Sequence, residues 1–413
     1  MIQHRRRNSE TDSGVEENAA RRLPASIWAL GFVSLFMDIS SEMIHALLPV
    51  FLVTVLGAST VTVGIIEGIG EAAASIAKLF SGWLSDRLGK RKLLTVLGYG
   101  IGALSKPLFA LAPAASWVLI ARFSDRIGKG IRGAPRDALV SELAPPRLWG
   151  AAYGLRQSLD TVGAFAGPLL AIALMALSSD NFRLVFWLAV VPGLIAVGIL
   201  VIGVREPARH VPERAARTPI RWQELGVLGG HFWGVVGVGT VLTLARFSEA
   251  FLILRAEEQG LPLTLVPAVL IVMNVVYAVS AYPMGALSDK ADKRVILTGG
   301  FTVLIIADII LALAPNFWVV ILGAGLWGLH MGMTQGLLAT LVAETAPAAL
   351  RGSAFGLFHL VTGMALLAAS LIAGVLWEWV GPSATFIAGA AFTAVGLAGA
   401  ITLLGRRRER AGR

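Results

Sequence analysis

The stretch LVSELAPPRLWGAAYGL at residues 139–155 returns as LVAETAPAALRGSAFGL at residues 341–357, an offset of 202 residues. A second pair, GWLSDRLGKR at 82–91 and GALSDKADKR at 285–294, is separated by 203 residues. Two unrelated pairs that share nearly the same offset indicate a duplicated unit whose copies run in the same orientation. The sequence therefore predicts two homologous halves.

Composition places these halves in a lipid bilayer. Of the 413 residues, 56% are apolar and only 15% are charged, whereas about a quarter of the residues in a soluble protein are charged. Each membrane helix needs about 20 to 25 residues, and the apolar part of the chain has room for twelve. We expect an all-α integral membrane protein with helices at 27–56, 61–84, 92–112, 117–141, 150–177, 183–203, 226–255, 264–287, 296–313, 317–341, 353–379 and 384–404.

The charged segments set the predicted orientation and domain limits. Lys and Arg gather in alternate joints between the helices, and this bias marks the cytoplasmic side. A cleaved signal peptide is not expected, because the first residues are polar and no cleavage pattern follows the first apolar stretch. The prediction is a multi-pass protein of the cytoplasmic (inner) membrane with a disordered cytoplasmic tail (1–23), a six-helix half (24–203), a cytoplasmic linker (204–225), a second six-helix half (226–404) and a basic cytoplasmic tail (405–413).

Several classes of function are disfavoured by what the sequence lacks. The net charge of +9 follows from the cytoplasmic joints, so nucleic acid is not an expected partner. The absence of cysteine excludes a disulfide framework, a thiolate metal site and a cysteine nucleophile. Neither a phosphate-binding G-x-x-x-x-G-K-[ST] loop nor a G-x-S-x-G elbow occurs. We expect neither an enzyme nor an ATP-driven pump, and no cofactor.

Three motifs resemble those of the major facilitator superfamily, and the resemblance covers nearly all of the chain. GWLSDRLGKRKLL (82–94) matches the family's loop between helices 2 and 3, and ARFSDRIGKGIRGAPRDAL (121–139) is similar to its helix 4 signature. GAFAGPLLA (163–171) is similar to the Gly-x-x-x-Gly-Pro motif of its exporters, without the closing glycine pair. The resemblance implies two pseudo-symmetric six-helix halves and a secondary transporter, working as a monomer, that moves a small molecule by alternating access.

The loop between helices 2 and 3 is predicted to act in gating. Asp86 should lie against the N-terminus of helix 11 near Gly352 and accept hydrogen bonds from its free N–H groups. The cations beside it would pair with acidic groups when the cytoplasmic side is shut, so that the loop works as a latch; alternatively, they only fix topology. The candidate gating residues are Gly82, Asp86, Arg87, Gly89, Lys90, Arg91, Asp289, Gly163, Gly167 and Pro168.

Charges inside the predicted spans are unevenly divided, with many more in the first half than in the second. Each costs about 2.5–3.5 kcal/mol when it faces lipid near the bilayer centre, so these side chains must pair or face water. At 100° per residue they form stripes on helices 1, 2, 4 and 5, which could meet in one network. The stripes either form a buried structural network or handle protons and substrate.

Under the second interpretation, Asp38 and Glu42 handle substrate or protons, and Arg122, Asp125 and Arg126 carry coupling. In the second half Arg246 and Glu249 are expected to pair with each other or to line the cavity, and the polar residues of helices 8 and 10 either bind substrate or bond neighbouring helices. The full candidate set is Asp38, Glu42, His45, Glu67, Glu71, Arg122, Asp125, Arg126, Lys129, Arg156, Asp160, Arg246, Glu249, Asn274, His330 and Gln335.

The expected function is proton-coupled export of a small molecule across the membrane. Two alternatives stay open: uptake or exchange of a small polar or anionic metabolite, and export of a divalent metal or metal chelate. The second arises because Asp38, Glu42 and His45, at i, i+4 and i+7, place two carboxylates and an imidazole on one helix face, as a divalent ion requires. No fourth ligand is evident, so no metal ligand is assigned.

Overall fold

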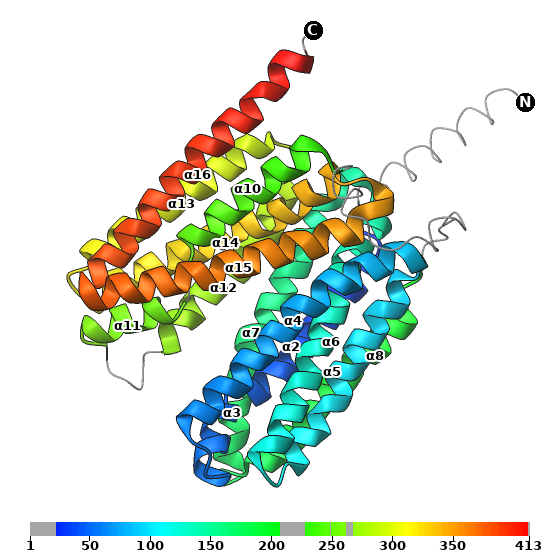
Figure 1. Cartoon of the computed structure of the whole chain (residues 1–413), viewed down its shortest axis with the longest axis vertical. Coiled ribbons are helices and arrows are strands. Elements are labelled where there is room, and N and C mark those ends of the chain that lie inside the picture. The colour runs from blue at the N-terminus through cyan, green and yellow to red at the C-terminus, as the bar shows by residue number, and fades with distance from the viewer. Residues whose placement is uncertain (1–21, 207–227, 248, 262–266, 412–413) are drawn as a thin grey trace, which may run out of the picture.

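The computed structural model describes residues 22–206, 228–247, 249–261 and 267–411, and within these ranges the chain is built from helices. The predicted N-terminal tail and most of the predicted linker lie outside the described residues. The described helices form two bundles, which meet at one end and diverge toward the other (Figure 1).

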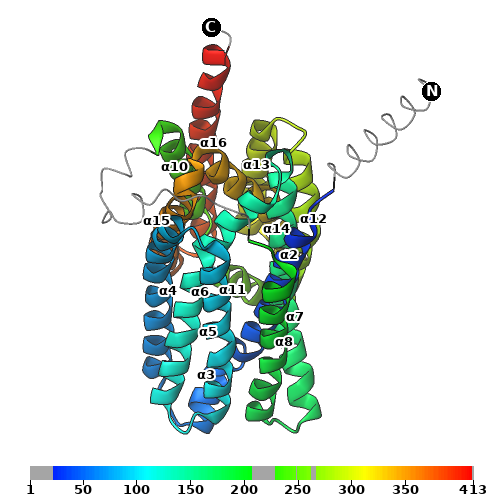
Figure 2. The same ribbon diagram turned by 90° about the vertical axis from the view of Figure 1, so that its right-hand side faces the viewer.

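The helices of the first half are α2 (Ala25–His45), α3 (Leu48–Val50), η1 (Phe51–Val55), α4 (Thr60–Leu88), α5 (Arg91–Leu111), α6 (Ala115–Leu143), η2 (Pro146–Leu148), α7 (Trp149–Leu177) and α8 (Phe182–Gly203). Those of the second half are α10 (Gly229–Ala245), α11 (Ala250–Glu258), α12 (Pro267–Ser288), α13 (Lys293–Leu313), α14 (Phe317–Thr345), η5 (Ala348–Leu350), α15 (Arg351–Trp379) and α16 (Pro382–Ala411). Figure 2 shows α4 to α8 running alongside one another in the first bundle.

The two halves repeat each other closely, as the sequence predicts. The limits of α5 and α13, of α6 and α14, and of α7 and α15 are each separated by 202 residues at both ends. The same offset therefore relates single positions in the two halves, and it can be used to compare their side chains.

Most predicted spans match the helices to within a few residues, but two spans predicted as continuous are broken. The first is interrupted after His45, because Pro49 has no N–H to continue the helical hydrogen bonds. The seventh leaves its helix at Arg246, with φ −107° and ψ 80°, and resumes at Ala250. Neither glycine nor proline lies between Ala245 and Ala250, so composition alone did not predict this second break.

The outer surface suits a bilayer. Ten of the described helical segments have the length and hydropathy to cross a membrane. The two other long helices, α4 and α6, are not among them, and they carry many of the charges predicted to avoid lipid. Large apolar side chains such as Leu104, Leu177 and Leu371 are exposed on the outside of the bundles. Contact with lipid would remove this apolar surface from water.

The halves meet mainly through α4 with α15 and α7 with α12, and also through α7 with α14 and α6 with α15. These pairs are tightest at one end of the molecule, where Gly82 packs on the backbone of Gly352 and Gly150 on the backbone of Gly285. We call this the closed end. The bundles diverge toward the opposite end, where α3 and α11 lie far apart (Figure 1).

Candidate functional site

The predicted charge stripes on α2, α4, α6 and α7 meet inside the first bundle and form two clusters. One, the break cluster, lies beside the interruption of the first span and consists of Ser41, Glu42, His45, Glu71, Lys106, Asp125 and Arg126. The other, the boundary cluster, lies where the two halves meet and consists of Asp137, Arg136, Arg156, Asp160 and His359. The stripes therefore meet, but in two clusters and not in the single network that the sequence suggested.

The centre of the break cluster is an ion pair between Lys106 and Asp125. The Nζ atom of Lys106 lies 2.7 Å from Oδ1 of Asp125 and donates a second hydrogen bond to Oγ of Ser41 at 3.0 Å. Lys106 is fully buried and the side chain of Asp125 is 5% exposed. A buried pair of this kind is costly to break, since the remaining charge has no solvent around it.

His45 connects this pair to a more accessible carboxylate. Its Nε2 atom lies 3.4 Å from Oδ2 of Asp125, and its Nδ1 atom lies 3.6 Å from Oε1 of Glu42. The side chain of Glu42 is 34% exposed. An imidazole between two carboxylates can accept a proton on one nitrogen and release one from the other. The geometry therefore offers a short chain of titratable groups from an accessible carboxylate to a buried one.

Two further members of the break cluster come from α4 and α6. Arg126 NH1 lies 3.1 Å from Oε1 of Glu71, and its NH2 lies 3.5 Å from Nδ1 of His45. Arg122 is buried on α6 and packs beside Gly70 of α4. Lys129 is partly buried on the same helix, and the side chain of Glu67 is outside the described part of the structure.

The two glycines of the exporter-like motif set the distance between α7 and α2. A Cβ atom on Gly163 would lie 2.9 Å from the Cβ of Asp38, and one on Gly167 would lie 2.7 Å from the Cβ of Glu42. Such contacts are too close for any larger residue without movement of a helix. The close approach predicted for these glycines is therefore present, and it holds two candidate carboxylates in place. Pro168 lies within α7, directly after Gly167.

The boundary cluster joins the halves through a carboxylate. Oδ2 of Asp137 on α6 lies 2.8 Å from Nε2 of His359 on α15, while Oδ1 of Asp137 lies 3.2 Å from Nε of Arg136. Asp160 lies 3.7 Å from Arg156 and 3.9 Å from Arg136. Because these contacts include a residue of the second half, any movement of the halves at this level must change the surroundings of Asp137.

Asp38 interacts with Asp160 of the boundary cluster. The Oδ1 atom of Asp38 lies 3.9 Å from NH2 of Arg132, whose guanidinium stacks 4.3 Å from the ring centre of Tyr99. His45 instead faces Glu42 and Asp125. The set Asp38, Glu42 and His45 does not converge, and no group of three His, Asp or Glu residues in the described part of the chain is placed to hold a metal ion.

The closed end contains the contact predicted for Asp86. Its Oδ1 accepts from the backbone N–H of Gly352 at 2.9 Å, and its Oδ2 accepts from that of Ser353 at 2.6 Å. These are free donors of the first turn of α15. Asp289 repeats the contact, accepting from Gly150 at 2.7 Å and Ala151 at 2.8 Å in the first turn of α7.

Each carboxylate therefore caps a helix of the opposite half, and we call these the two capping contacts. Burial raises the pKa of the Asp289 carboxyl, although its two N–H donors and Lys293 act in the opposite direction. The gating role of these residues remains a prediction.

The cations of the same loop have different surroundings. Arg91 is 1% exposed, donates to Oδ1 of Asp86 at 2.7 Å and lies 2.8 Å from Oε1 of Glu142. Arg87 stacks on the ring of Trp83, while Lys90 is exposed. Gly89 ends α4 with φ +63°, a conformation that glycine adopts without strain. Within the described part of the chain, Arg91 is the cation of these three that has acidic partners, as a latch requires.

Candidate residues of the second half are more dispersed. Arg246 lies in the helix break, and its two terminal nitrogens donate to the side-chain oxygen of Gln335 when that amide is oriented to satisfy both its ends. Arg246 and Glu249, which the sequence predicts to pair or to line the cavity, interact electrostatically with each other, although the break removes the helical spacing on which the predicted pair rested. The charge of Glu249 also interacts with that of Glu42 across the two halves.

The polar residues of α12 and α14 differ in accessibility. His330 is fully buried, and its Nδ1 atom lies 2.8 Å from the carbonyl oxygen of Gly300 on α13. Of the two roles expected for His330, substrate binding or hydrogen bonding to a neighbouring helix, the structure shows the hydrogen bond. Asn274 is half-buried on α12. One turn away, Tyr277 is close enough to Arg246 for an electrostatic interaction.

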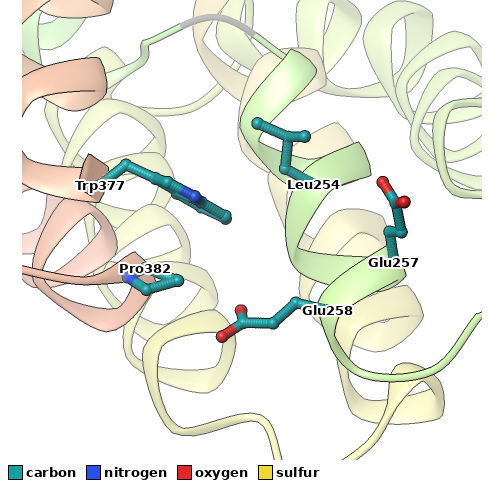
Figure 3. Close-up of a pocket in the computed structure, with 5 residues that line it drawn as sticks. All are labelled: Leu254, Glu257, Glu258, Trp377 and Pro382. Carbon is teal, nitrogen blue, oxygen red and sulfur yellow. The ribbon is translucent and has the colours of Figure 1, made fainter.

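A separate pocket of about 460 Å³ lies in the second half, lined by Leu254, Glu257, Glu258, Trp377 and Pro382. Figure 3 shows the indole of Trp377 across from the two glutamates of α11. Neither glutamate belongs to the break or boundary cluster. This pocket is therefore distinct from the charge network.

Sequence reasoning missed three members of the network. Lys106 is the one charged residue in the apolar stretch 94–112, and this isolation was a usable signal. Asp137 closes the charged stripe of α6, but its partner could not be read from that helix. His359 comes from the opposite half, so no pattern local to α6 or α15 connects it to Asp137.

Comparisons with known proteins agree with this architecture. The family model of the Major Facilitator Superfamily matches residues 30–274 and 238–413. The "Uncharacterized MFS-type transporter MJ1317" of Methanocaldococcus jannaschii is 32% identical over 397 residues, covering 94% of this chain and 95% of that protein. The "Inner membrane transport protein YajR" of Escherichia coli is 22% identical over 392 residues, covering 91% and 82% of the two chains.

Solved structures show the same fold. The E. coli transporter FucP, in the outward conformation, superposes with a TM-score of 0.77 at 16% identity, over 91% of this chain and 98% of that one. The human organic anion transporter MFSD10 gives a TM-score of 0.73 at 16% identity, over 92% and 100% of the two chains. The duplicated halves, the paired helix breaks and the family model lead to one conclusion: this chain belongs to the Major Facilitator Superfamily.

Proposed function

We propose that this protein is a proton-coupled secondary transporter that exports a small molecule by alternating access. The supporting observation is the sequence of contacts from Glu42 through His45 to Asp125 and Lys106. It connects a partly exposed carboxylate to a buried ion pair in the middle of the first bundle. Carboxylates in such surroundings are typical of proton pathways in membrane proteins.

The proposed orientation places the closed end in the cytoplasm. The cationic joints, including Arg87, Lys90, Lys290 and Lys293, are at this end, and cationic loops face the cytoplasm. The bundles diverge at the other end, so the molecule has the arrangement of an outward-facing state. In this state a proton from outside reaches Glu42 first.

The proposed cycle follows from the contacts of Asp125. A proton passed from Glu42 through His45 neutralises Asp125 and removes the partner of Lys106. The unpaired Lys106 ammonium then favours rearrangement of α5 against α6, because a buried charge without a partner is costly. Return of the proton to the cytoplasmic side restores the pair. Movement of the proton in this direction would drive export.

A second candidate is uptake or exchange of a small anionic metabolite. The observation that favours it is the row of cations on α6, with Arg122, Arg126, Lys129, Arg132 and Arg136 all turned into the bundle. Guanidinium groups bind carboxylates and phosphates in bidentate fashion. Under this alternative some of these cations bind substrate in place of neighbouring carboxylates.

Reconstitution into proteoliposomes with an entrapped pH-sensitive dye tests the proposal. A panel of small organic cations, anions and neutral compounds is added with an imposed pH gradient. An exporter moves protons opposite to the compound, whereas proton-coupled uptake moves both together. Glu42→Gln and Asp125→Asn should lose pH-driven transport, and Glu257→Gln, outside the network, should retain it. Full pH-driven transport in both network variants would refute the coupling assignment.

Counterflow of labelled compound separates a carrier from a channel. A carrier exchanges external label against a high internal concentration of unlabelled compound, and a channel does not. Exchange that persists in Asp125→Asn, without response to the pH gradient, is the pattern expected when coupling is lost and substrate binding is kept.

A further inference from the structure

Among the described residues of the second half, one buried carboxylate is not used by the network. Asp308 on α13 is 0% exposed, and neither of its carboxyl oxygens forms a hydrogen bond of ordinary geometry, although the indole N–H of Trp327 is near enough to interact with the carboxyl. It forms no ion pair with any residue of the described chain. A bare carboxylate in such surroundings costs many kcal/mol, so either a bound cation or a proton must be present.

The nearby charged groups are engaged elsewhere. On the α10–α11 side, Arg246 bonds to Gln335, and Arg255 bonds to Glu258 and to carbonyl oxygens at the end of α13. Glu249 is an acid and cannot neutralise another carboxylate. On α14, His330 is bonded to the carbonyl of Gly300. The described side chains of α12 and α16 include no charged residue.

The groups that do face Asp308 can serve a neutral carboxylic acid. The indole N–H of Trp327 on α14 interacts with its carboxyl. A Cβ atom added to Gly389 on α16 would lie 2.8 Å from Oδ2 of Asp308 and 3.1 Å from the carbonyl oxygen of Ala245. Both oxygens therefore lie close to Gly389. Ala245 is the last residue of α10, so its carbonyl has lost its helical donor. One donor and one acceptor are thus placed beside the carboxyl.

The pseudo-symmetry gives this position a counterpart. The offset of 202 relates Asp308 to Lys106 and Trp327 to Asp125, the two residues of the buried ion pair. Both positions lie beside a broken helix, at His45 in one half and Ala245 in the other. The first half neutralises its buried charge with a lysine, and the second half has no lysine to do so.

We propose that Asp308 is a proton-binding site, and that its protonated carboxyl donates to the carbonyl of Ala245 and so holds the break between α10 and α11. Loss of the proton would leave a buried anion beside a free carbonyl, and the two would repel. The break would then have to move, or water would have to enter. The link between this movement and the transport cycle rests on the proposed function. The protonation of Asp308 does not depend on that function.

Infrared difference spectroscopy tests the protonation directly. The carbonyl-stretch band of a protonated carboxyl should be present in the wild-type protein in proteoliposomes at neutral pH and should be missing in Asp308→Asn. Asp292→Asn, at an exposed helix N-cap, should leave the band unchanged. An identical band in wild type and Asp308→Asn would overturn the proposal.

Two further measurements distinguish a bound proton from a bound sodium ion. Carbodiimide labelling of the wild-type protein followed by peptide mass spectrometry reports a protonated Asp308 without any variant, and absence of label there counts against the site. Thermal stabilisation by NaCl over KCl that disappears in Asp308→Asn would show that sodium occupies the position and would overturn the proton assignment. Neither measurement depends on transport. If the wild-type protein showed no pH-driven transport, the proposed function would be refuted, but the proposal for Asp308 would not.

Discussion

Asp86 and Asp289 occupy equivalent positions in the two halves, and each carboxylate accepts two backbone N–H bonds from the first turn of a helix in the other half. The N-terminus of a helix carries partial positive charge, so these contacts combine hydrogen bonding with attraction to the helix dipole. Opening the closed end requires both carboxylates to lose their donors. The two residues therefore control the same step from opposite sides.

Replacing Asp86 with alanine should open the closed end. Each charge-assisted hydrogen bond contributes about 1.5–3 kcal/mol, so loss of two should shift the equilibrium between states by at least about a hundredfold. Because the chain has no native cysteine, spin labels can be placed at Leu88→Cys and Ala349→Cys, on opposite halves. Electron–electron distance measurements should show a longer distance in Asp86→Ala.

Asp289→Ala is the matched comparison. It should produce a smaller shift, since Asp289 is only half-buried while Asp86 is buried and also bonded to Arg91. An unchanged distance distribution in the double variant would show that the capping contacts do not hold the closed end.

Two ion pairs at equivalent positions beside the capping contacts, Arg91–Glu142 and Lys293–Glu344, should contribute differently to the free energy of unfolding. In the Arg91–Glu142 pair the side chain of Arg91 is 1% exposed, whereas in the Lys293–Glu344 pair both side chains are about a quarter exposed. Glu142→Gln should lower the free energy of unfolding by about 1.5–3 kcal/mol, and Glu344→Gln by at most about 1 kcal/mol. Thermal unfolding of the two purified variants in the same detergent measures the difference. Equal losses would contradict the role of burial.

Gly167→Ala should impair both packing and function. The added Cβ would lie 2.7 Å from that of Glu42, which forces α7 away from α2 and moves the carboxylate. Overpacking of this kind costs about 1–3 kcal/mol. Gly198→Ala on α8 is the control, because a Cβ there meets no atom within 4 Å and should leave unfolding and transport unchanged or slightly improve stability. A fully active Gly167→Ala would refute the positioning argument.

Lys106→Met should leave Asp125 buried without its strongest partner. Breaking a buried pair from one side costs about 3–5 kcal/mol. Adding Asp125→Asn should recover part of this loss, since the unpaired charge is then removed, but pH-driven transport should stay absent. The double-mutant cycle of thermal stabilities gives the interaction energy. An additive cycle would show that the two residues are not coupled in the protein.

The sequence predicted the features that depend on residues close together in the chain, and it missed those that depend on how distant helices pack. The repeated motifs around Asp86 and Asp289 predicted two halves and the contact with Gly352, because both rest on local patterns and helix-end chemistry. Lys106 was not selected as a site residue, because its partnership with Asp125 depends on how α5 packs against α6. The break at Arg246 has no proline or glycine to mark it and arises from tertiary structure.

The capping contacts also divide mutational sensitivity unequally between the surfaces they join. The acceptors are the side chains of Asp86 and Asp289, which any substitution alters. The donors are backbone amides of Gly352, Ser353, Gly150 and Ala151, which every residue except proline supplies. At Ser353 and Ala151 the side chain can therefore change during evolution without removing a donor, whereas neither aspartate has that freedom. A comparison of variants in the population should find tolerance on the helix side and constraint on the loop side of the same contact.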